Sequence, residues 1–225
     1  TFLISASNLA GDLNNQFIPD SQLENIFSNV PIYDPLIILG FFVGILLPVM
    51  FSAKLLKAVK QGAKEVVAEV QCQFRDIDGL KDGRKDAKPD YNRCIDLSTK
   101  NALRNMFKPV LMIILVVLAT GILFGPMVIA ALLVGNLIGC MVFGFFMSVS
   151  GGAWDNAKKA IEDGAYKGKG SFAHKSAILG DTIGDPLKDC TGPSMNIIIT
   201  TINTLAITFL PIFINTGYLW SYFSL

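Results

Sequence analysis

All nineteen lysine and arginine residues of this chain fall in two blocks, and this distribution limits how the chain can fold. The first block runs from Lys54 to Lys108 and the second from Lys158 to Lys188. Outside them lie three long stretches without any charged side chain, at 35–53, 109–150 and 192–225. Because a membrane span needs about 20 mainly apolar residues, and 52% of the chain is hydrophobic, the pattern predicts an integral membrane protein.

The middle uncharged stretch is too long for one span, since a single span takes roughly 20 residues. Gly121, Gly125 and Pro126 offer a turn near its centre. We therefore expect an all-α, polytopic membrane helix bundle with about four transmembrane helices, at 35–53, 109–125, 126–150 and 194–216. The second span is short, so we expect its helix to start near Ser98 and to kink at Pro109.

The two basic blocks lie on one side of the membrane in this four-span path, and the positive-inside rule makes that side cytoplasmic. Residues 54–108 are then a cytoplasmic basic helical extension, and residues 151–193 are a second cytoplasmic segment. Residues 1–34 are a non-cytoplasmic segment with room for the end of a preceding helix. No signal peptide is expected, because the first residues lack a charged n-region.

Cysteine and histidine patterns carry little information here. The four cysteines form no CxxC pair, and the only histidine is His174. Neither a zinc site nor a disulfide framework is therefore supported. We expect His174 to be a solvated loop residue and Trp154 to be an anchor at the membrane interface.

The second basic block holds two groups of charges that bear on function. The first group has i, i+3, i+4, i+7 spacing, which places its members on one face of a helix that continues out of the third span: Asp155, Lys158, Lys159 and Glu162. The second group recurs at i, i+4 and i+7 or i+8 just before the fourth span: Asp181, Asp185, Lys188 and Asp189.

Two antiparallel helices joined by a loop at 163–179 would aim both charged faces into one gap. Gly180 and Gly184 allow close approach of a ligand or a helix, and Pro186 is tolerated near a helix start. Carboxylates in the gap suit Mg²⁺, which prefers oxygen ligands, and lysines suit phosphate oxygens. The alternative is a pair of solvated, salt-bridged helix ends, because each i, i+4 pair is worth only about 0.2–0.5 kcal/mol. Finding both groups at matching membrane depth favours the magnesium and phosphate site.

These residues resemble the C-terminal part of the membrane-bound, ion-translocating pyrophosphatases, which pump H⁺ or Na⁺. The resemblance covers about residues 35 to 200 and is most specific in the run Gly180-Asp181-Thr182-Ile183-Gly184-Asp185-Pro186-Leu187-Lys188-Asp189. Further matches are Gly151 to Lys159, Glu69-Val70 with Gln73-Phe74, and Lys88-Pro89-Asp90-Tyr91 with Cys94.

The resemblance implies hydrolysis of Mg-pyrophosphate at the cytoplasmic face, coupled to H⁺ or Na⁺ translocation by a homodimer of sixteen-helix subunits. It implies a vacuolar or acidocalcisome-type membrane in a eukaryote and the plasma membrane in a prokaryote. Its expected partners are pyrophosphate, the lipid bilayer and the remaining N-terminal helices of the pump, with no nucleic acid. By the same resemblance Asp189 positions and deprotonates the attacking water, and the other motif residues divide into substrate ligands (Lys158, Lys159 and Lys188) and Mg²⁺ ligands (Asp155, Asp181 and Asp185).

The chain departs from the family pattern in ways that leave other functions open. It has about a third of the usual length and lacks the second Asp-rich motif, so it cannot form the active site alone. The family's ion-gate lysine, twelve residues after the motif lysine, is replaced by Thr200. The alternatives are a hydrolysis-only or degenerate membrane pyrophosphatase and a non-enzymatic phosphate- or Mg²⁺-binding membrane subunit. The choice between H⁺ and Na⁺, and any dependence on K⁺, depends on helices outside this sequence.

Overall fold

The computed structural model describes residues 32–84 and 86–216, and within them every regular element is a helix. Three long helices are joined by short connections: α3 (Pro35–Asp76), α4 (Tyr91–Phe124) and α5 (Pro126–Glu162). After the short turn η1 (Ala165–Lys167), the chain returns through α6 (Phe172–Asp185), η2 (Pro186–Thr191), α7 (Gly192–Thr208) and α8 (Leu210–Thr216). In the described part, α3, α4 and α5 are long and apolar enough to cross a membrane.

The predicted all-α membrane helix bundle is thus confirmed. The span expected at 194–216 falls on α7 and α8, which are separate helices with Phe209 between them, and its membrane crossing stays a prediction. Most of the expected non-cytoplasmic segment, residues 1–31, lies outside the described residues.

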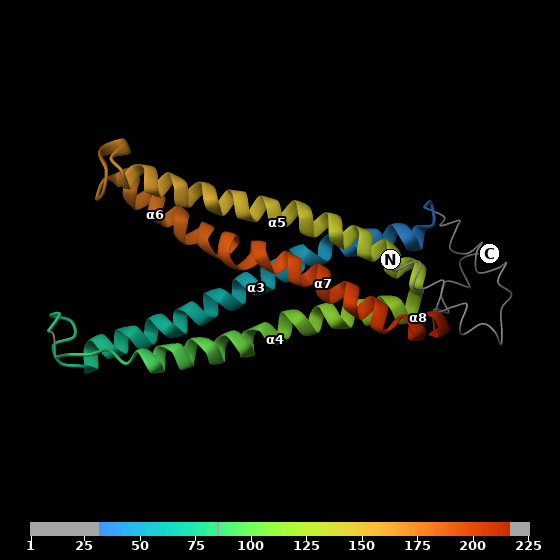
Figure 1. Cartoon of the computed structure of the whole chain (residues 1–225), viewed down its shortest axis with the longest axis horizontal. Coiled ribbons are helices and arrows are strands. Elements are labelled where there is room, and N and C mark those ends of the chain that lie inside the picture. The colour runs from blue at the N-terminus through green and yellow to red at the C-terminus, as the bar shows by residue number, and fades with distance from the viewer. Residues whose placement is uncertain (1–31, 85, 217–225) are drawn as a thin grey trace.

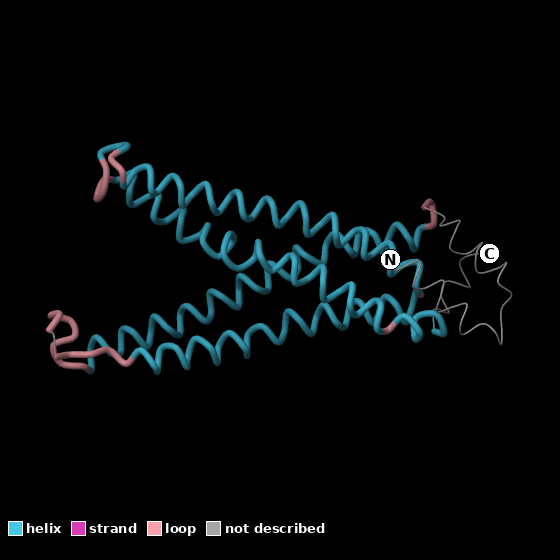
Figure 2. The backbone as a smooth tube through the Cα atoms, viewed as in Figure 1, coloured by secondary structure: helices cyan, strands magenta, loops and turns pink. Residues whose placement is uncertain are grey.

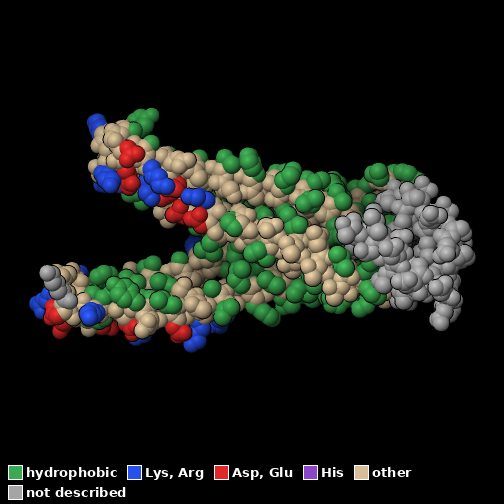
Figure 3. All heavy atoms as spheres, in the orientation of Figure 1, with side chains coloured by type: hydrophobic (Ala, Val, Ile, Leu, Met, Phe, Trp, Pro, Cys, Tyr) green, Lys and Arg blue, Asp and Glu red, His purple; other side chains and the backbone are tan. Residues whose placement is uncertain are grey.

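The helices form two antiparallel hairpins that cross (Figure 1). One hairpin is α3 with α4, and the other is α5 with the path from α6 to α8. The hairpins lie together at one end and diverge toward the end that carries the connections 77–90 and 163–171 (Figure 2). Charged side chains concentrate on the two diverging arms, while the rest of the visible surface is mainly apolar (Figure 3). Both basic blocks therefore lie at the same end of the molecule, as their distribution in the sequence predicts.

Local signals in the sequence set the helix boundaries. Asp34 accepts a hydrogen bond from the Leu36 backbone N–H at 2.7 Å and so caps α3. Asp90 caps α4 through the Arg93 N–H at 3.0 Å, so α4 starts at Tyr91 and the start expected near Ser98 is wrong. Gly125, with φ of 83°, makes the turn between α4 and α5, in a conformation that favours glycine.

Close contact between α3 and α5 holds the two hairpins together. It depends on four glycines at four-residue spacing, Gly40 and Gly44 on α3 and Gly135 and Gly139 on α5. A Cβ atom added to Gly44 would lie 2.2 Å from the Leu132 carbonyl oxygen, and one added to Gly135 would lie 2.1 Å from that of Phe41. Small residues let membrane helices approach to backbone contact, where van der Waals packing drives association.

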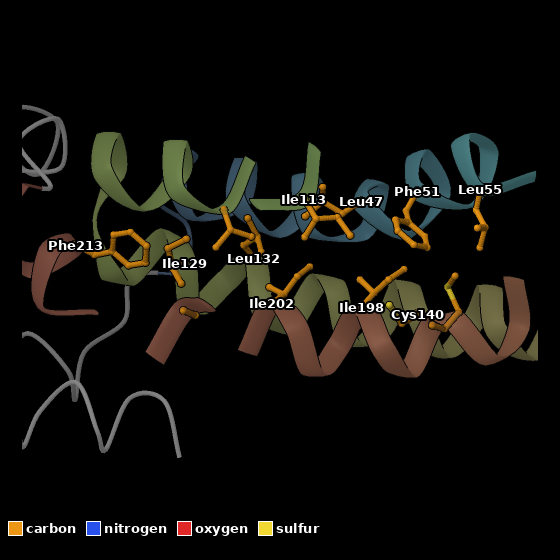
Figure 4. Close-up of a cluster of buried hydrophobic side chains, with 13 residues drawn as sticks. Leu47, Phe51, Leu55, Ile113, Ile129, Leu132, Cys140, Ile198, Ile202 and Phe213 are labelled. Carbon is orange, nitrogen blue, oxygen red and sulfur yellow. The ribbon is translucent and has the colours of Figure 1, made fainter. Parts of the chain in front are cut away.

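The buried core lies where α3, α4, α5 and α7 meet (Figure 4). Leu47, Ile129, Leu132 and Ile202 are almost fully buried there, and Phe213 of α8 closes one end. The side chains around this core are apolar and exposed on the outside, which suits a lipid environment.

At the far end of the first hairpin, two segments that carried the family resemblance meet. The Gln73 side chain donates to the Asp90 carbonyl oxygen at 3.1 Å and accepts from the Asp90 N–H at 2.9 Å. Arg93 pairs with Glu69 at 3.0 Å. These bonds join α3 to the start of α4 and stabilise the hairpin beyond its apolar part.

Candidate functional site

The candidate site lies at the charged end of the second hairpin, where α5 packs against α6 and η2. α5 continues past its apolar part to Glu162. Asp155 and Lys158 lie on the face that meets α6 and η2, as the spacing predicts. The Ser171 hydroxyl accepts from the His174 N–H at 3.1 Å and starts α6 at Phe172. The connection therefore runs only from 163 to 171, and the longer loop expected at 163–179 is wrong.

Glycines allow these helices to approach closely. A Cβ atom on Gly151 would lie 2.4 Å from the Gly184 carbonyl oxygen, which means that the backbones of α5 and α6 touch. Gly180 is covered by the ring of Trp154, whose Cε3 atom lies 2.2 Å from the position of a Cβ atom. Trp154 thus packs against α6 with one face of its ring while 47% of the residue stays exposed.

Two ion pairs cross from one helix to the other. The Lys188 Nζ atom lies 2.9 Å from Asp155 Oδ2, and Lys158 donates to Asp181 Oδ2. Lys159, on the same helix as Asp155, reaches the same Oδ2 atom at 2.9 Å. The structure therefore places five of the seven predicted site residues in ion pairs at this contact, as two separate groups: Lys188 and Lys159 with Asp155, and Lys158 with Asp181. We call these two groups together the charged network.

The ion pairs favour the charged forms of Asp155, Lys158 and Lys188. The hydrogen bond from Lys188, followed by that from Lys159, lowers the pKa of Asp155 to about 2. The same bond to Asp155 raises the pKa of Lys188, and the bond to Asp181 raises the pKa of Lys158. The site consequently presents fixed charges of both signs near neutral pH.

Asp185 and Asp189, the other two predicted site residues, stand apart from this network. Both are exposed, and among the described residues neither forms an ion pair. Their carboxylates are free to meet a ligand. Asp185 ends α6 and Asp189 lies in η2, so both exposed carboxylates lie on the segment that carries Lys188.

A magnesium ion fits this set of side chains only in part. Carboxylate oxygens are the right donors for Mg²⁺, and Asp181 Oδ1 is buried without a hydrogen-bond partner. However, the described residues contain no group of three histidine, cysteine, aspartate or glutamate side chains placed to hold a metal ion. The chain can therefore supply one edge of a metal site rather than a complete one.

The position of His174 differs most from the sequence prediction, which was a solvated loop residue. It lies in the first turn of α6 with its side chain 14% exposed, and its Nε2 atom is 3.1 Å from Glu162 Oε1. Its Nδ1 atom accepts from the Gly170 N–H at 3.2 Å. The pattern Ser171-x-x-His174 at a helix start was the signal that could have placed it. His174 links the ends of α5 and α6 beyond the site.

The sequence matches the family of inorganic H⁺ pyrophosphatases over residues 2–209. It is 43% identical over 216 residues to the K(+)-insensitive pyrophosphate-energized proton pump of Methanosarcina mazei, covering 96% of this chain and 31% of the relative. It is 41% identical over 182 residues to the K(+)-stimulated pyrophosphate-energized sodium pump of Thermotoga maritima, covering 80% and 25%. It is 40% identical over 200 residues to pyrophosphate-energized membrane proton pump 3 of Arabidopsis thaliana, covering 84% and 25%. The chain thus spans a third or less of the length of these relatives.

Proposed function

Because this chain belongs to the family of inorganic H⁺ pyrophosphatases, we propose that it forms part of a membrane pump that hydrolyses pyrophosphate and translocates H⁺ or Na⁺. The chain spans 31% of the Methanosarcina relative, so the rest of the pump supplies the other side of the substrate site. The site faces the cytoplasm in this proposal, because both basic blocks lie at the same end of the bundle.

The observation that carries the proposal is the set of ion pairs that join α5 to α6 and η2. Two lysines from different elements, Lys158 and Lys188, are held at this contact by Asp181 and Asp155. Pyrophosphate oxygens would accept hydrogen bonds from these lysines and from Lys159. If these charges served only to join two helix ends by salt bridges, the exposed carboxylates of Asp185 and Asp189 would have no part in that role.

In the reaction, Asp189 orients a water molecule and accepts its proton. The water oxygen forms a bond to one phosphorus atom while the bridging P–O bond breaks, which gives two phosphates. Lys158 and Lys188 hold the substrate in line and stabilise the charge on the leaving phosphate. Asp155, Asp181 and Asp185 would hold Mg²⁺, which supplies neutralisation of phosphate charge when bound.

A second candidate, hydrolysis without pumping, is favoured by one observation. The predicted spans at 35–53, 109–125 and 126–150 carry no acidic or basic side chain, and α7 has Thr200 twelve residues after Lys188. Ion pathways through membranes usually contain ionisable groups. The two candidates share the substrate site and differ only in transport.

Replacing Asp189 with asparagine in the full-length protein tests the substrate site. We expect Asp189→Asn to lower pyrophosphate hydrolysis by about 10²- to 10⁴-fold, the usual effect of removing a general base. Binding of Mg-pyrophosphate should stay near that of the natural protein. Asp163→Asn, which removes an exposed carboxylate at the end of α5, is the matched control and should remain active. Normal hydrolysis by Asp189→Asn would contradict the assigned role.

A further inference from the structure

The helix that carries Lys188 and Asp189 has an unusual backbone. At η2 it widens into a π-helix, in which the Gly192 N–H donates to the carbonyl of Leu187, five residues earlier. Pro186 begins this turn and has no N–H to donate to the preceding turn. Wide turns of this kind are rare and occur mainly at functional sites. Here the turn contains the substrate lysine and the water-positioning aspartate of the proposed site.

Thr191 closes this wide turn with its side chain. It is fully buried, and its hydroxyl lies 2.9 Å from the Pro186 carbonyl oxygen and 3.2 Å from that of Leu187. A hydroxyl has one proton to donate, so the bond is shared between carbonyls five and four residues back. Thr182, Thr200 and Thr204 each donate to a single carbonyl, four residues back, as in an ordinary α-helix. The bond of Thr191 therefore depends on the wide turn.

We propose that the Thr191 hydroxyl is a positioning group for the reaction, because it holds η2 in the wide form that directs Lys188 toward Asp155 and leaves Asp189 exposed. Without the hydroxyl, the Pro186 and Leu187 carbonyls lose the buried donor that they share only in the wide turn. The wide form then loses this stabilisation relative to an ordinary α-helix, in which each carbonyl pairs with the N–H four residues later. A π-turn accommodates one more residue than an α-turn, so tightening shifts the register of the flanking residues by one position, or roughly 100° around the helix axis. Lys188 and Asp189 would then no longer face the gap together. This inference rests on the proposed function.

Three variants of the full-length protein in membranes separate the hydroxyl from the shape of the side chain. Thr191→Val keeps the shape and removes the donor, and Thr191→Ser keeps the donor and removes a methyl group. Thr216→Val removes a similar threonine bond, to the Ile212 carbonyl at 2.7 Å in α8, at the opposite end of the molecule. The measurements are kcat and KM for pyrophosphate hydrolysis.

We expect Thr191→Val to lower kcat about tenfold, which corresponds to ~1.4 kcal/mol on the barrier, with a smaller rise in KM. Thr191→Ser and Thr216→Val should keep kcat within about twofold of the natural protein, a change of less than ~0.5 kcal/mol. If Thr191→Val does not accumulate, Thr191→Cys replaces it, since a thiol is a weaker donor of similar size, and its kcat should fall below that of Thr191→Ser.

An active natural protein with unchanged kcat in Thr191→Val, or with equal loss in Thr191→Val and Thr191→Ser, would overturn the positioning role and leave the proposed function standing. Equal kcat in Thr191→Cys and Thr191→Ser would overturn it as well. A natural protein without pyrophosphate hydrolysis would contradict the proposed function, and this inference with it.

Discussion

The Asp155 Oδ2 atom accepts hydrogen bonds from two lysines, which differ in their exposure and in the element that carries them. Lys188 reaches it from η2 with its side chain 36% exposed, whereas Lys159 reaches it from the next turn of α5 with its side chain 62% exposed. An exposed ion pair between residues of one helix contributes little to the stability of the fold. The contact from Lys188 joins η2 to α5.

Replacing each lysine with methionine tests this difference. We expect Lys188→Met to raise KM for pyrophosphate about tenfold or more, the effect of one lost hydrogen bond between charged groups. Lys159→Met should raise it much less, because its side chain extends into solvent. Steady-state hydrolysis by the full-length protein measures both values. A larger effect of Lys159→Met would contradict the assignment of Lys188 as the main substrate ligand.

The ionisation of Asp155 leads to a prediction about pH. Its pKa in the folded protein is lowered to about 2, chiefly by the hydrogen bond from Lys188, and an unfolded aspartate titrates near 3.9. Ionised Asp155 therefore stabilises the fold above the unfolded pKa, and this contribution is lost as the pH falls toward the folded pKa.

The difference in unfolding temperature between the natural protein and Asp155→Asn should thus stay constant from about pH 8 to about pH 5 and shrink below about pH 4. Thermal unfolding in detergent across this range measures it. Asp163→Asn provides a carboxylate outside the network for comparison. A difference that shrinks between pH 8 and pH 6 would show that Asp155 is not held ionised by its lysines.

At the scale of helices, the contact of α5 with α6 and η2 rests on one of two adjacent glycines. A Cβ atom on Gly151 would lie 2.4 Å from the Gly184 carbonyl oxygen, whereas one on Gly152 would have no neighbour within 4 Å. The first contact is with backbone, which cannot turn away. Of these two glycines, only Gly151 is needed for the close approach of α5 to α6.

Gly151→Ala should therefore push the helices apart, lower the unfolding temperature and weaken pyrophosphate binding, because Lys188 moves away from Asp155. Gly152→Ala should stabilise the protein by up to about 1 kcal/mol, since alanine favours a helix more than glycine does. Thermal unfolding and substrate binding of the two variants measure the contrast. Equal behaviour of the pair would show that α5 and α6 do not meet as described.

The elements show why part of the structure could be predicted from the sequence. Membrane helices have long apolar runs, and the turn at Gly125 followed by Pro126 is a local signal, so the all-α bundle was predictable. The face of α5 with Asp155 and Lys158 follows from 3.6-residue periodicity. The wide turn at η2 has no such signal, because Pro186 permits several backbone forms. His174 was misplaced because the cap at Ser171 was read as part of a loop.

At the scale of the whole molecule, the two hairpins diverge at the charged end. A cavity of about 630 Å³ lies where they part, lined by α3 with Lys60 and Lys64 and by α6 and η2 with Thr182 and Pro186. In the described part of the chain the two hairpins are thus separate at this end, and charged side chains lie on both of them (Figure 3).

A substitution at Thr200 tests whether ion transport can be changed without changing hydrolysis. It is exposed on α7 and its hydroxyl donates to the Asn196 carbonyl at 3.0 Å. It lies roughly 18 Å along the helix from Lys188, at ~1.5 Å per residue. Thr200→Lys should therefore change ion transport and leave pyrophosphate hydrolysis within about twofold, a barrier change below ~0.5 kcal/mol. A large loss of hydrolysis in this variant would show that the two regions are coupled more directly than the distance suggests.

The central claim, that this chain carries part of the substrate site of a pyrophosphate-driven pump, is tested most directly in sealed vesicles that contain the full-length protein. Phosphate release and uptake of H⁺ or Na⁺ are measured together after pyrophosphate and Mg²⁺ are added outside. We predict both phosphate release and ion uptake, and the loss of both in Asp189→Asn. Phosphate release without uptake would establish the hydrolysis-only alternative, and the absence of phosphate release would contradict the account.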